Sequence, residues 1–354
     1  MIILDLVPYI LFLIISQLIG ILQRKQAIII LILLFGIFLG FRYMVGWDFM
    51  NYYRTIINAG WELERFEFIP QQLGLLAHKA GNPQIFIFIM GFATILFFFT
   101  TLYKRSTDLR FSLFAFTCLP VFFIDSFTTI RFTLAVGICF FAYYYFNDNL
   151  KKSLLLILLA TFVHRAAFFG FLIPLIRNFK INLFTNILLF IISIIIGISG
   201  IEKLVYTIFN TSLIPFVSES TYNHMAGYIT DANASGFSKS RYIYTIFNLI
   251  NFIFYRKIIE NNNEIKKNIF LYNIGCCCLY IFSFSSTLAP RLSTFFLTSI
   301  LLIVPFYKRI PLIKIFVYLL LFAVFVYQLS IIGYHPDFAT RRNCFVPYQF
   351  YFFQ

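Results

Sequence analysis

The chain has 354 residues, of which 60% are hydrophobic, 21% aromatic and only 12% charged, and its mean hydropathy is +0.85. A soluble domain usually has about 25% charged residues and no more than about half apolar ones, and a fold of this length has too little interior to bury so much apolar surface. The composition therefore excludes soluble enzymes, disordered tails and nucleic-acid-binding domains, and it indicates an all-α, polytopic integral membrane protein.

Transmembrane helices are predicted from apolar segments, because a bilayer core requires about 20 apolar residues per helix. The first segment lacks a basic n-region and a cleavage site of small residues, so it is interpreted as a retained span and not as a removed signal. In chain order, the predicted spans cover residues 2–22, 27–45, 84–103, 111–127, 132–146, 183–200, 242–255, 269–286, 292–307 and 312–334.

Residues 153–176 are apolar but contain His164 and Arg165. An ionised arginine in the middle of the bilayer costs at least about 2.5–3.5 kcal/mol. We therefore expect a hairpin, with 153–163 going out, 166–176 returning, and His164 and Arg165 at its outer tip. This division gives about 11–12 helices and places most of the Lys and Arg residues in short loops on one side, which is then cytoplasmic.

Two long segments face the outer side in this topology, 46–83 and 201–241. The first includes residues 68–80, which are apolar on one face and could form an interfacial helix. We expect one transmembrane domain over residues 1–354 that carries these two outer loops. The sequence shows no convincing internal repeat, which weakly disfavours transporters built from inverted repeats.

Four arginines lie at predicted membrane boundaries on the outer side: Arg42, Arg131, Arg165 and Arg291. A single one is readily explained as a residue that extends its charge to the membrane surface. Four in such positions favour a binding role, because a guanidinium pairs with phosphate oxygens through two hydrogen bonds. The sequence therefore predicts a site for a pyrophosphate held at headgroup depth.

Three strings of residues contain most of these arginines: Phe41–Tyr53, Asp125–Gly137 and Leu159–Ala167. In the first, Gly46 permits a tight turn, after which Asp48, Asn51 and Tyr52 can fall on one face of a helix. The strings read R-x-x-V-G-x-D-x-x-x-Y from Arg42, R-x-x-L-A from Arg131, and L-A-x-x-x-H ending at His164. A dibasic pair, a later outer arginine and a terminal P-Y motif complete the pattern: Lys151 and Lys152, Arg291, and Pro347 and Tyr348.

These strings, in this order and topology, resemble the EpsG-like branch of the Wzy-type polysaccharide polymerases. The resemblance covers most of the chain, although Tyr351 stands where a phenylalanine is common and loop 201–241 has no matching pattern. It implies glycosyl transfer at the outer face of a bacterial inner membrane. The growing glycan on one undecaprenyl pyrophosphate would pass to the sugar of a second lipid-linked repeat unit. The implied partners are the undecaprenyl-pyrophosphate-linked oligosaccharide, the lipid bilayer, a chain-length regulator and a flippase, with no nucleic acid.

This reaction requires a general base for the acceptor hydroxyl and positive charge for the departing pyrophosphate. We expect Arg131 and Arg291 to bind the pyrophosphate, with Arg42 and Arg165 supporting. His164 is the first candidate base, because imidazole titrates near neutral pH. Its structural alternative is a buried histidine bonded to a backbone carbonyl.

Further candidates are less specific. Asp48 is an alternative base or a helix N-cap, and Asp125 could orient Arg131 or cap a helix. Tyr52 could stack on a sugar, while His224 and Arg241 are possible glycan contacts in the second loop. No cofactor is expected, and no metal, since the outer face has no acidic pair at metal-ligand spacing.

Other classes of function remain open. A flippase or transporter for lipid-linked oligosaccharides would also need basic groups, but it should place charges along a path through the midplane. A glycosyltransferase that uses polyprenyl-phosphate sugars would depend on an acid in an outer loop, a role that Asp48 could fill. An O-antigen ligase cannot be separated from a polymerase by these residues.

Overall fold

The computed structural model describes residues 2–22, 25–146, 149–176, 179, 182–199, 240–283, 285, 287–333 and 344–353. Within these ranges every regular element is a helix, and β-pairing is limited to one isolated bridge between Arg42 and Phe350. The all-α prediction is therefore confirmed. The chain divides into two compact units, Met1–Phe171 with Val304–Gln354, and Leu172–Ile303, which are described separately.

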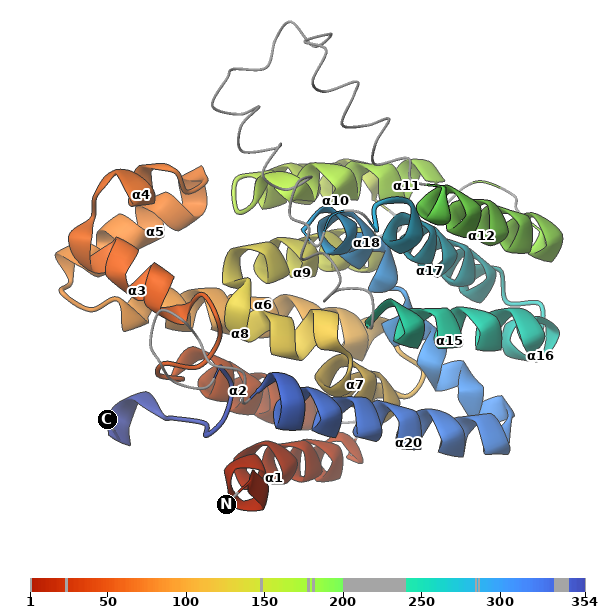
Figure 1. Ribbon diagram of the computed structural model, residues 1–354, viewed down its shortest axis with the longest axis horizontal. Coiled ribbons are helices and arrows are strands. Elements are labelled where there is room, and N and C mark those ends of the chain that lie inside the picture. Colours follow the sequence, from red (N-terminus) through yellow and green to blue (C-terminus); the bar gives the residue numbers. More distant parts are fainter. Residues whose placement is uncertain are drawn as a thin grey trace, which may run out of the picture. The chain divides into compact units, whose positions relative to one another are not determined.

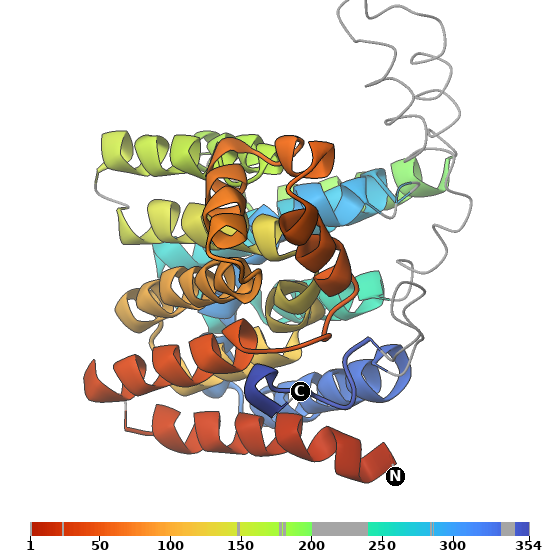
Figure 2. The same ribbon diagram turned by 90° about the vertical axis from the view of Figure 1, so that its left-hand side faces the viewer.

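The first unit contains a series of packed apolar helices. In both views α1, α2, α6, α9 and α10 lie one above another in this order (Figures 1 and 2). Its elements are α1 (Ile2–Gly20), α2 (Lys25–Gly40), α3 (Phe49–Asn58), α4 (Trp61–Glu64), α5 (Phe68–Lys79), α6 (Gln84–Arg105), α7 (Leu109–Cys118), η1 (Pro120–Ile124), α8 (Asp125–Thr128), α9 (Ile130–Tyr145), α10 (Leu150–Thr161), η2 (Arg165–Phe171), η4 (Val304–Arg309), α20 (Pro311–Tyr327), η5 (Gln328–Ile332) and η6 (Tyr351–Phe353).

Aromatic side chains pack against one another in the interior of this unit. The rings of Phe12 and Phe38 stack at 4.2 Å, and Phe35 meets Phe99 edge to face at 4.7 Å. Such ring pairs are favourable beyond their buried area. Helices α2 and α6 approach closely at Gly40, where an added Cβ would lie 2.7 Å from the Phe88 ring.

Among the described residues, three helical stretches are long and apolar enough to cross a membrane: Gln84–Arg105, Leu288–Arg309 and Pro311–Ile331. Five shorter apolar helices accompany them, and each of the predicted spans has a helical counterpart. The chain is therefore a multi-pass membrane protein of all-α fold, while the number of 11–12 crossings stays a prediction.

The predicted span 111–127 is not one straight helix. It is broken between Cys118 and Pro120, and the two parts, Leu109–Cys118 and Pro120–Thr128, are bent by 66°. Proline has no amide hydrogen and its ring clashes with the preceding turn, so a helix ends before it. The bend directs α8 towards the start of α9.

The predicted reversal at His164 is confirmed. Helix α10 ends at Thr161, and the chain continues as the 3-10 helix η2 from Arg165. An added Cβ on Gly170 would lie 3.3 Å from Cγ2 of Ile157, whereas a continuous helix would separate these two residues by about 20 Å. The two arms therefore run side by side, with His164 and Arg165 at the tip.

Basic residues at the end of α6 contact the end of α9. Arg105 at the end of α6 donates from Nε to the carbonyl oxygen of Tyr144 at the end of α9, and Lys104 lies 3.7 Å from the ring centroid of Tyr145. These basic residues are predicted to be cytoplasmic. The predicted outer residues meet at the opposite ends of the same helices.

Buried asparagines connect helices within the second unit. Its elements are α11 (Leu172–Ile176), α12 (Leu183–Ile198), α15 (Ser240–Ile253), α16 (Tyr255–Ile259), α17 (Asn263–Ile281), α18 (Leu288–Leu297) and α19 (Ile300–Ile303). The amide of Asn273 on α17 donates to the carbonyl of Asn186 on α12 at 2.9 Å, and Asn248 on α15 donates to Asn273 at 2.8 Å. Hydrogen bonds of this kind hold apolar helices together. Most of the predicted loop 201–241 lies outside the described residues.

Candidate functional site

The turn at Gly46 leads from α2 into segment 46–83, which is predicted to face the outer side. Gly46 has a φ of 104°, and a Cβ on it would overlap the carbonyl group of Phe127, so the position requires glycine. Its amide donates to the carbonyl of Cys344 at 2.8 Å. The next amide, that of Trp47, donates to Oγ1 of Thr128 at 3.3 Å. The predicted tight turn is thus present, and it positions the start of α3 beside the end of α8.

Arg42 is fully buried at the end of α2. Its guanidinium donates to three backbone carbonyls, those of Leu39, Val45 and Phe127, the last two at 3.0 Å. These bonds satisfy carbonyls that the end of a helix and a turn would leave without donors. The geometry favours structural support of the site by Arg42.

The residues that directly follow the terminal P-Y motif pair with the first string. Residues Arg42 and Phe350 form the isolated antiparallel bridge, and the amide of Tyr43 donates to the carbonyl of Gln349 at 2.9 Å. Two strings at opposite ends of the chain therefore build one local structure.

Arg131, the first predicted pyrophosphate ligand, lies in the first turn of α9 and is half-buried. Its Nη1 is 2.7 Å from Oε2 of Glu67, and the side chains of Arg131 and Glu67 are 21% and 11% exposed. The guanidinium lies over the ring of Phe66 at 4.1 Å and over that of Tyr52 at 5.7 Å. Its buried Nε has no hydrogen-bond partner among the described residues. The guanidinium is therefore bound by Glu67 through Nη1, while its Nε–H is left without an acceptor among the described residues.

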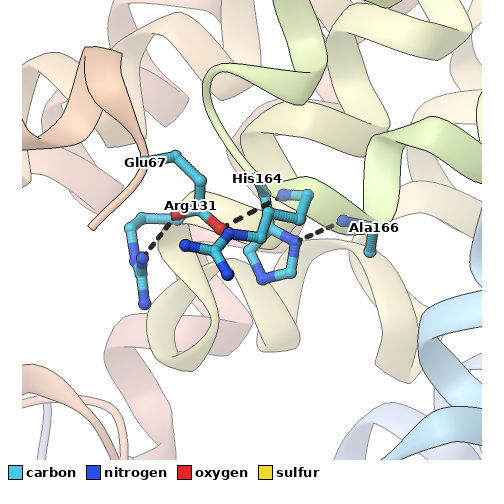
Figure 3. Close-up of polar contacts among 5 residues, drawn as sticks. Glu67, Arg131, His164 and Ala166 are labelled. Atoms are coloured by element: carbon cyan, nitrogen blue, oxygen red, sulfur yellow. Dashed lines mark hydrogen bonds and ion pairs between the residues drawn. The ribbon is translucent and has the colours of Figure 1, made fainter. Parts of the chain in front are cut away.

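Glu67 joins Arg131 to the tip of the hairpin (Figure 3). Its Oε1 accepts a hydrogen bond from the amide of Arg165 at 3.1 Å. Glu67 directly precedes α5 but makes no side-chain cap for that helix. Two residues later, the amide of Ile69 donates to the carbonyl of Phe162 at 3.0 Å. The start of α5 is therefore bonded to the hairpin tip twice.

His164 lies at this tip, half-buried, with its ring 5.4 Å from that of Phe132 in an edge-to-face arrangement. Its Nδ1 accepts a hydrogen bond from the amide of Ala166 at 3.1 Å (Figure 3). A neutral imidazole whose Nδ1 accepts carries its proton on Nε2. This bond is to a backbone amide, and the alternative of a bond to a backbone carbonyl stays a prediction. In this tautomer the ring donates from Nε2, and Nδ1 can take a proton only if it releases Ala166.

Tyr52 lies beside Arg131, and Asp48 lies close enough to Tyr52 to act on its pKa. Asp48 occupies the N-cap position of α3 without making a side-chain cap, and its Oδ1 lies 3.5 Å from Nδ2 of Asn51. Burial raises the pKa of Tyr52, the charge of Arg131 lowers it, and the charges of Asp48 and Glu67 raise it. Tyr52 is therefore a neutral phenol beside a guanidinium and two carboxylates.

Asp125 lies at the start of α8, close in sequence to Arg131. Within the described residues no hydrogen bond or ion pair joins its carboxylate to Arg131, and the contact that orients this arginine comes from Glu67. Asp125 begins α8, and its backbone carbonyl accepts from the amide of Thr129 at 2.8 Å. Its role as a substrate contact stays a prediction.

The remaining predicted site residues belong to the second unit or lie outside the described residues. Arg291 is half-buried in α18. Arg241 falls in the first turn of α15, with its guanidinium 5.4 Å from the ring centroid of Tyr280. His224 lies outside the described residues. The structure thus brings together Tyr52, Arg131, His164 and Arg165, with Glu67 between them, and the functional roles of all these residues stay predictions.

Within the described residues, no group of three or more His, Cys, Asp or Glu side chains could hold a metal ion. The metal-free reaction stays a prediction that a chelator experiment can test.

Glu67 is the residue that the sequence analysis missed. It is separated from Arg131 by 64 positions, and it belongs to none of the three strings. The available signal was its place directly before the apolar-faced segment 68–80, which the structure confirms as helix α5, Phe68–Lys79. An acid at the start of an outer helix is a candidate partner for an outer arginine.

Comparison with known proteins gives one assignment. No curated protein and no solved structure matches the chain. The model of the EpsG family matches residues 25–350, which include all three strings, Arg291 and the terminal P-Y motif. The match covers nearly the whole chain, so this protein belongs to the EpsG family, whose members are membrane proteins of polysaccharide biosynthesis.

Proposed function

We propose that this protein is a polysaccharide polymerase that joins undecaprenyl-pyrophosphate-linked oligosaccharide repeat units. The reaction takes place at the outer face of a bacterial inner membrane. The observation that carries the proposal is the arrangement of Arg131 beside the hairpin tip. One carboxylate, that of Glu67, binds the partly exposed guanidinium of Arg131, whose Nε has no partner among the described residues, and the backbone amide of Arg165, the residue after His164.

In the proposed step, a hydroxyl of one lipid-linked repeat unit attacks the anomeric carbon of the glycan on a second lipid. The bond between that carbon and the pyrophosphate oxygen breaks, and undecaprenyl pyrophosphate leaves with the electron pair. Arg131 stabilises the charge that develops on the leaving oxygen, with Arg165 as a further cation. The hydroxyl proton passes to His164, or to Asp48 in the alternative assignment.

Two features of the site support a sugar-phosphate substrate. The phenol of Tyr52 and the ring of Phe66 lie against Arg131, and aromatic rings beside a cation suit a ligand that combines a sugar with a phosphate. The hairpin tip exposes Arg165 next to this cation. A chain-length regulator and a flippase are the expected protein partners.

The experiment compares Arg131→Ala with Arg65→Ala in a strain that lacks the chromosomal gene. Arg65 is an exposed arginine of the same outer segment that stacks on Trp61 at 4.1 Å, so it controls for the loss of one positive charge. We expect Arg131→Ala to abolish long glycans and leave single lipid-linked repeats at the outer leaflet. Arg65→Ala should retain long glycans. Accumulation of repeats at the inner leaflet would overturn the proposal in favour of a flippase.

A further inference from the structure

We infer that Glu67 is a positioning residue that holds Arg131 and the His164 hairpin tip in one reactive arrangement. The inference rests on the proposed function, because it assigns Glu67 a part in the same site. It concerns a residue that lies outside every string shared with the family pattern.

The carboxylate of Glu67 bridges two segments of the chain. The two oxygens of the Glu67 carboxylate are used by different segments, Oε2 by Nη1 of Arg131 at 2.7 Å and Oε1 by the amide of Arg165 at 3.1 Å. The first segment begins α9 and the second forms the hairpin tip. One carboxylate therefore sets the distance between the cation and the residues on either side of Arg165.

The burial makes this bridge strong. The Glu67 side chain is 11% exposed and that of Arg131 is 21% exposed, so water competes little for either partner. Charge-assisted hydrogen bonds are roughly twice as strong as neutral ones. The neighbouring bond from the amide of Ile69 to the carbonyl of Phe162, at 3.0 Å, joins the start of α5 to the hairpin without using charge.

Glu67 directly precedes α5, but its carboxylate serves other elements. Glu67 does not cap α5, so its carboxylate is fully committed to the contacts with α9 and the hairpin. Because Ile69 and Phe162 still join the segments when the carboxylate is altered, a neutral substitution should change the placement of Arg131 more than the fold. We therefore expect the effect to appear in the chemical step and not in substrate binding.

The test measures kcat and KM of the purified full-length protein in lipid nanodiscs. The substrate is the pool of lipid-linked repeat units extracted from a strain without the gene. For Glu67→Gln we expect kcat to fall at least about tenfold and KM to stay within about threefold. Glu67→Asp keeps the charge on a shorter side chain and should recover part of this loss. Glu64→Gln, an exposed glutamate of the same segment, is the matched control and should behave as the unmodified protein.

Two results would overturn the inference. One is a Glu67→Gln protein with unchanged kcat. The other is a lower KM without loss of kcat, which would mean that Glu67 only competes with the substrate for Arg131. If Glu67→Gln does not fold, the kcat of Glu67→Asp decides, and a value equal to that of Glu64→Gln refutes a positioning role. Failure of the unmodified protein to extend the repeat units would instead refute the proposed function itself.

Discussion

Arg131 and Glu67 form an ion pair of 2.7 Å between the start of α9 and the residue before α5. The pair lies next to the hairpin tip, where the amide of Arg165 bonds to the same carboxylate. It is the contact around which the candidate site is built.

The first prediction concerns the shape of the cation at this contact. Arg131→Lys keeps the positive charge but loses the planar fork and the stacking on Phe66, which lies 4.1 Å away. Arginine and lysine are not equivalent at stacked or two-bonded sites, so we expect activity to fall at least about tenfold. The length distribution of the glycan, resolved by gel electrophoresis, measures this change. Full-length glycan in the Arg131→Lys strain would show that charge alone suffices.

The second prediction concerns Arg42. Replacement by methionine removes the donor for the carbonyls of Leu39, Val45 and Phe127. A buried acceptor left without a donor costs about 1–3 kcal/mol, so we expect a clear fall in the melting temperature of the protein in detergent. A normally stable Arg42→Met protein with a raised KM would instead show that Arg42 contacts the substrate.

The third prediction concerns the turn at Gly46. Gly46→Ala places a Cβ against the carbonyl of Phe127 at a φ of 104°, and a strained backbone conformation alone costs about 1–3 kcal/mol. Gly60→Ala is the control, since no atom lies within 4 Å of an added Cβ there and its φ is −88°. Thermal unfolding should separate the two variants. Equal melting temperatures would contradict the role assigned to this turn.

The sequence predicted the parts of the fold that depend on local physical chemistry. The cost of an ionised arginine in the bilayer was enough to place the reversal at His164 and Arg165, and the structure has it there. The apolar face of residues 68–80 was enough to predict helix α5. The bend before Pro120 was missed because the apolar composition continues through it, although the proline itself indicates a break.

The contacts of the site depend on tertiary structure, and the sequence predicted fewer of them. Arg42 and Arg131 look alike in the sequence as arginines at an outer membrane boundary. The structure separates them, because Arg42 is buried against backbone carbonyls and Arg131 faces a carboxylate. The sequence offered Asp125, which is close to Arg131 in the chain, as a residue that could orient it or cap a helix, whereas Glu67 reaches Arg131 from 64 positions away.

The fourth prediction identifies the proton acceptor. If His164 is the base, His164→Gln should lower kcat by about 10²–10⁴-fold, while Asp48→Asn should have a much smaller effect. Both substitutions preserve approximate size, so the amount of folded protein should be similar. Near-normal chain length in His164→Gln together with its loss in Asp48→Asn would assign the base to Asp48.

The fifth prediction concerns metal ions. Polymerisation by the purified protein should continue after treatment with a chelator and should not respond to added divalent cations. The physical reason is that arginine side chains can supply the positive charge that the leaving pyrophosphate requires. Loss of activity on chelation, restored by a divalent cation, would refute the metal-free reaction.

The central claim is that the protein polymerises lipid-linked repeat units at the outer face of the membrane. The most direct measurement compares the lipid-linked glycans of a strain lacking the gene with those of its parent, with each leaflet labelled separately. We expect the deletion strain to accumulate single repeat units on undecaprenyl pyrophosphate in the outer leaflet and to lack longer chains. Unchanged long chains, or single repeats confined to the inner leaflet, would contradict the claim.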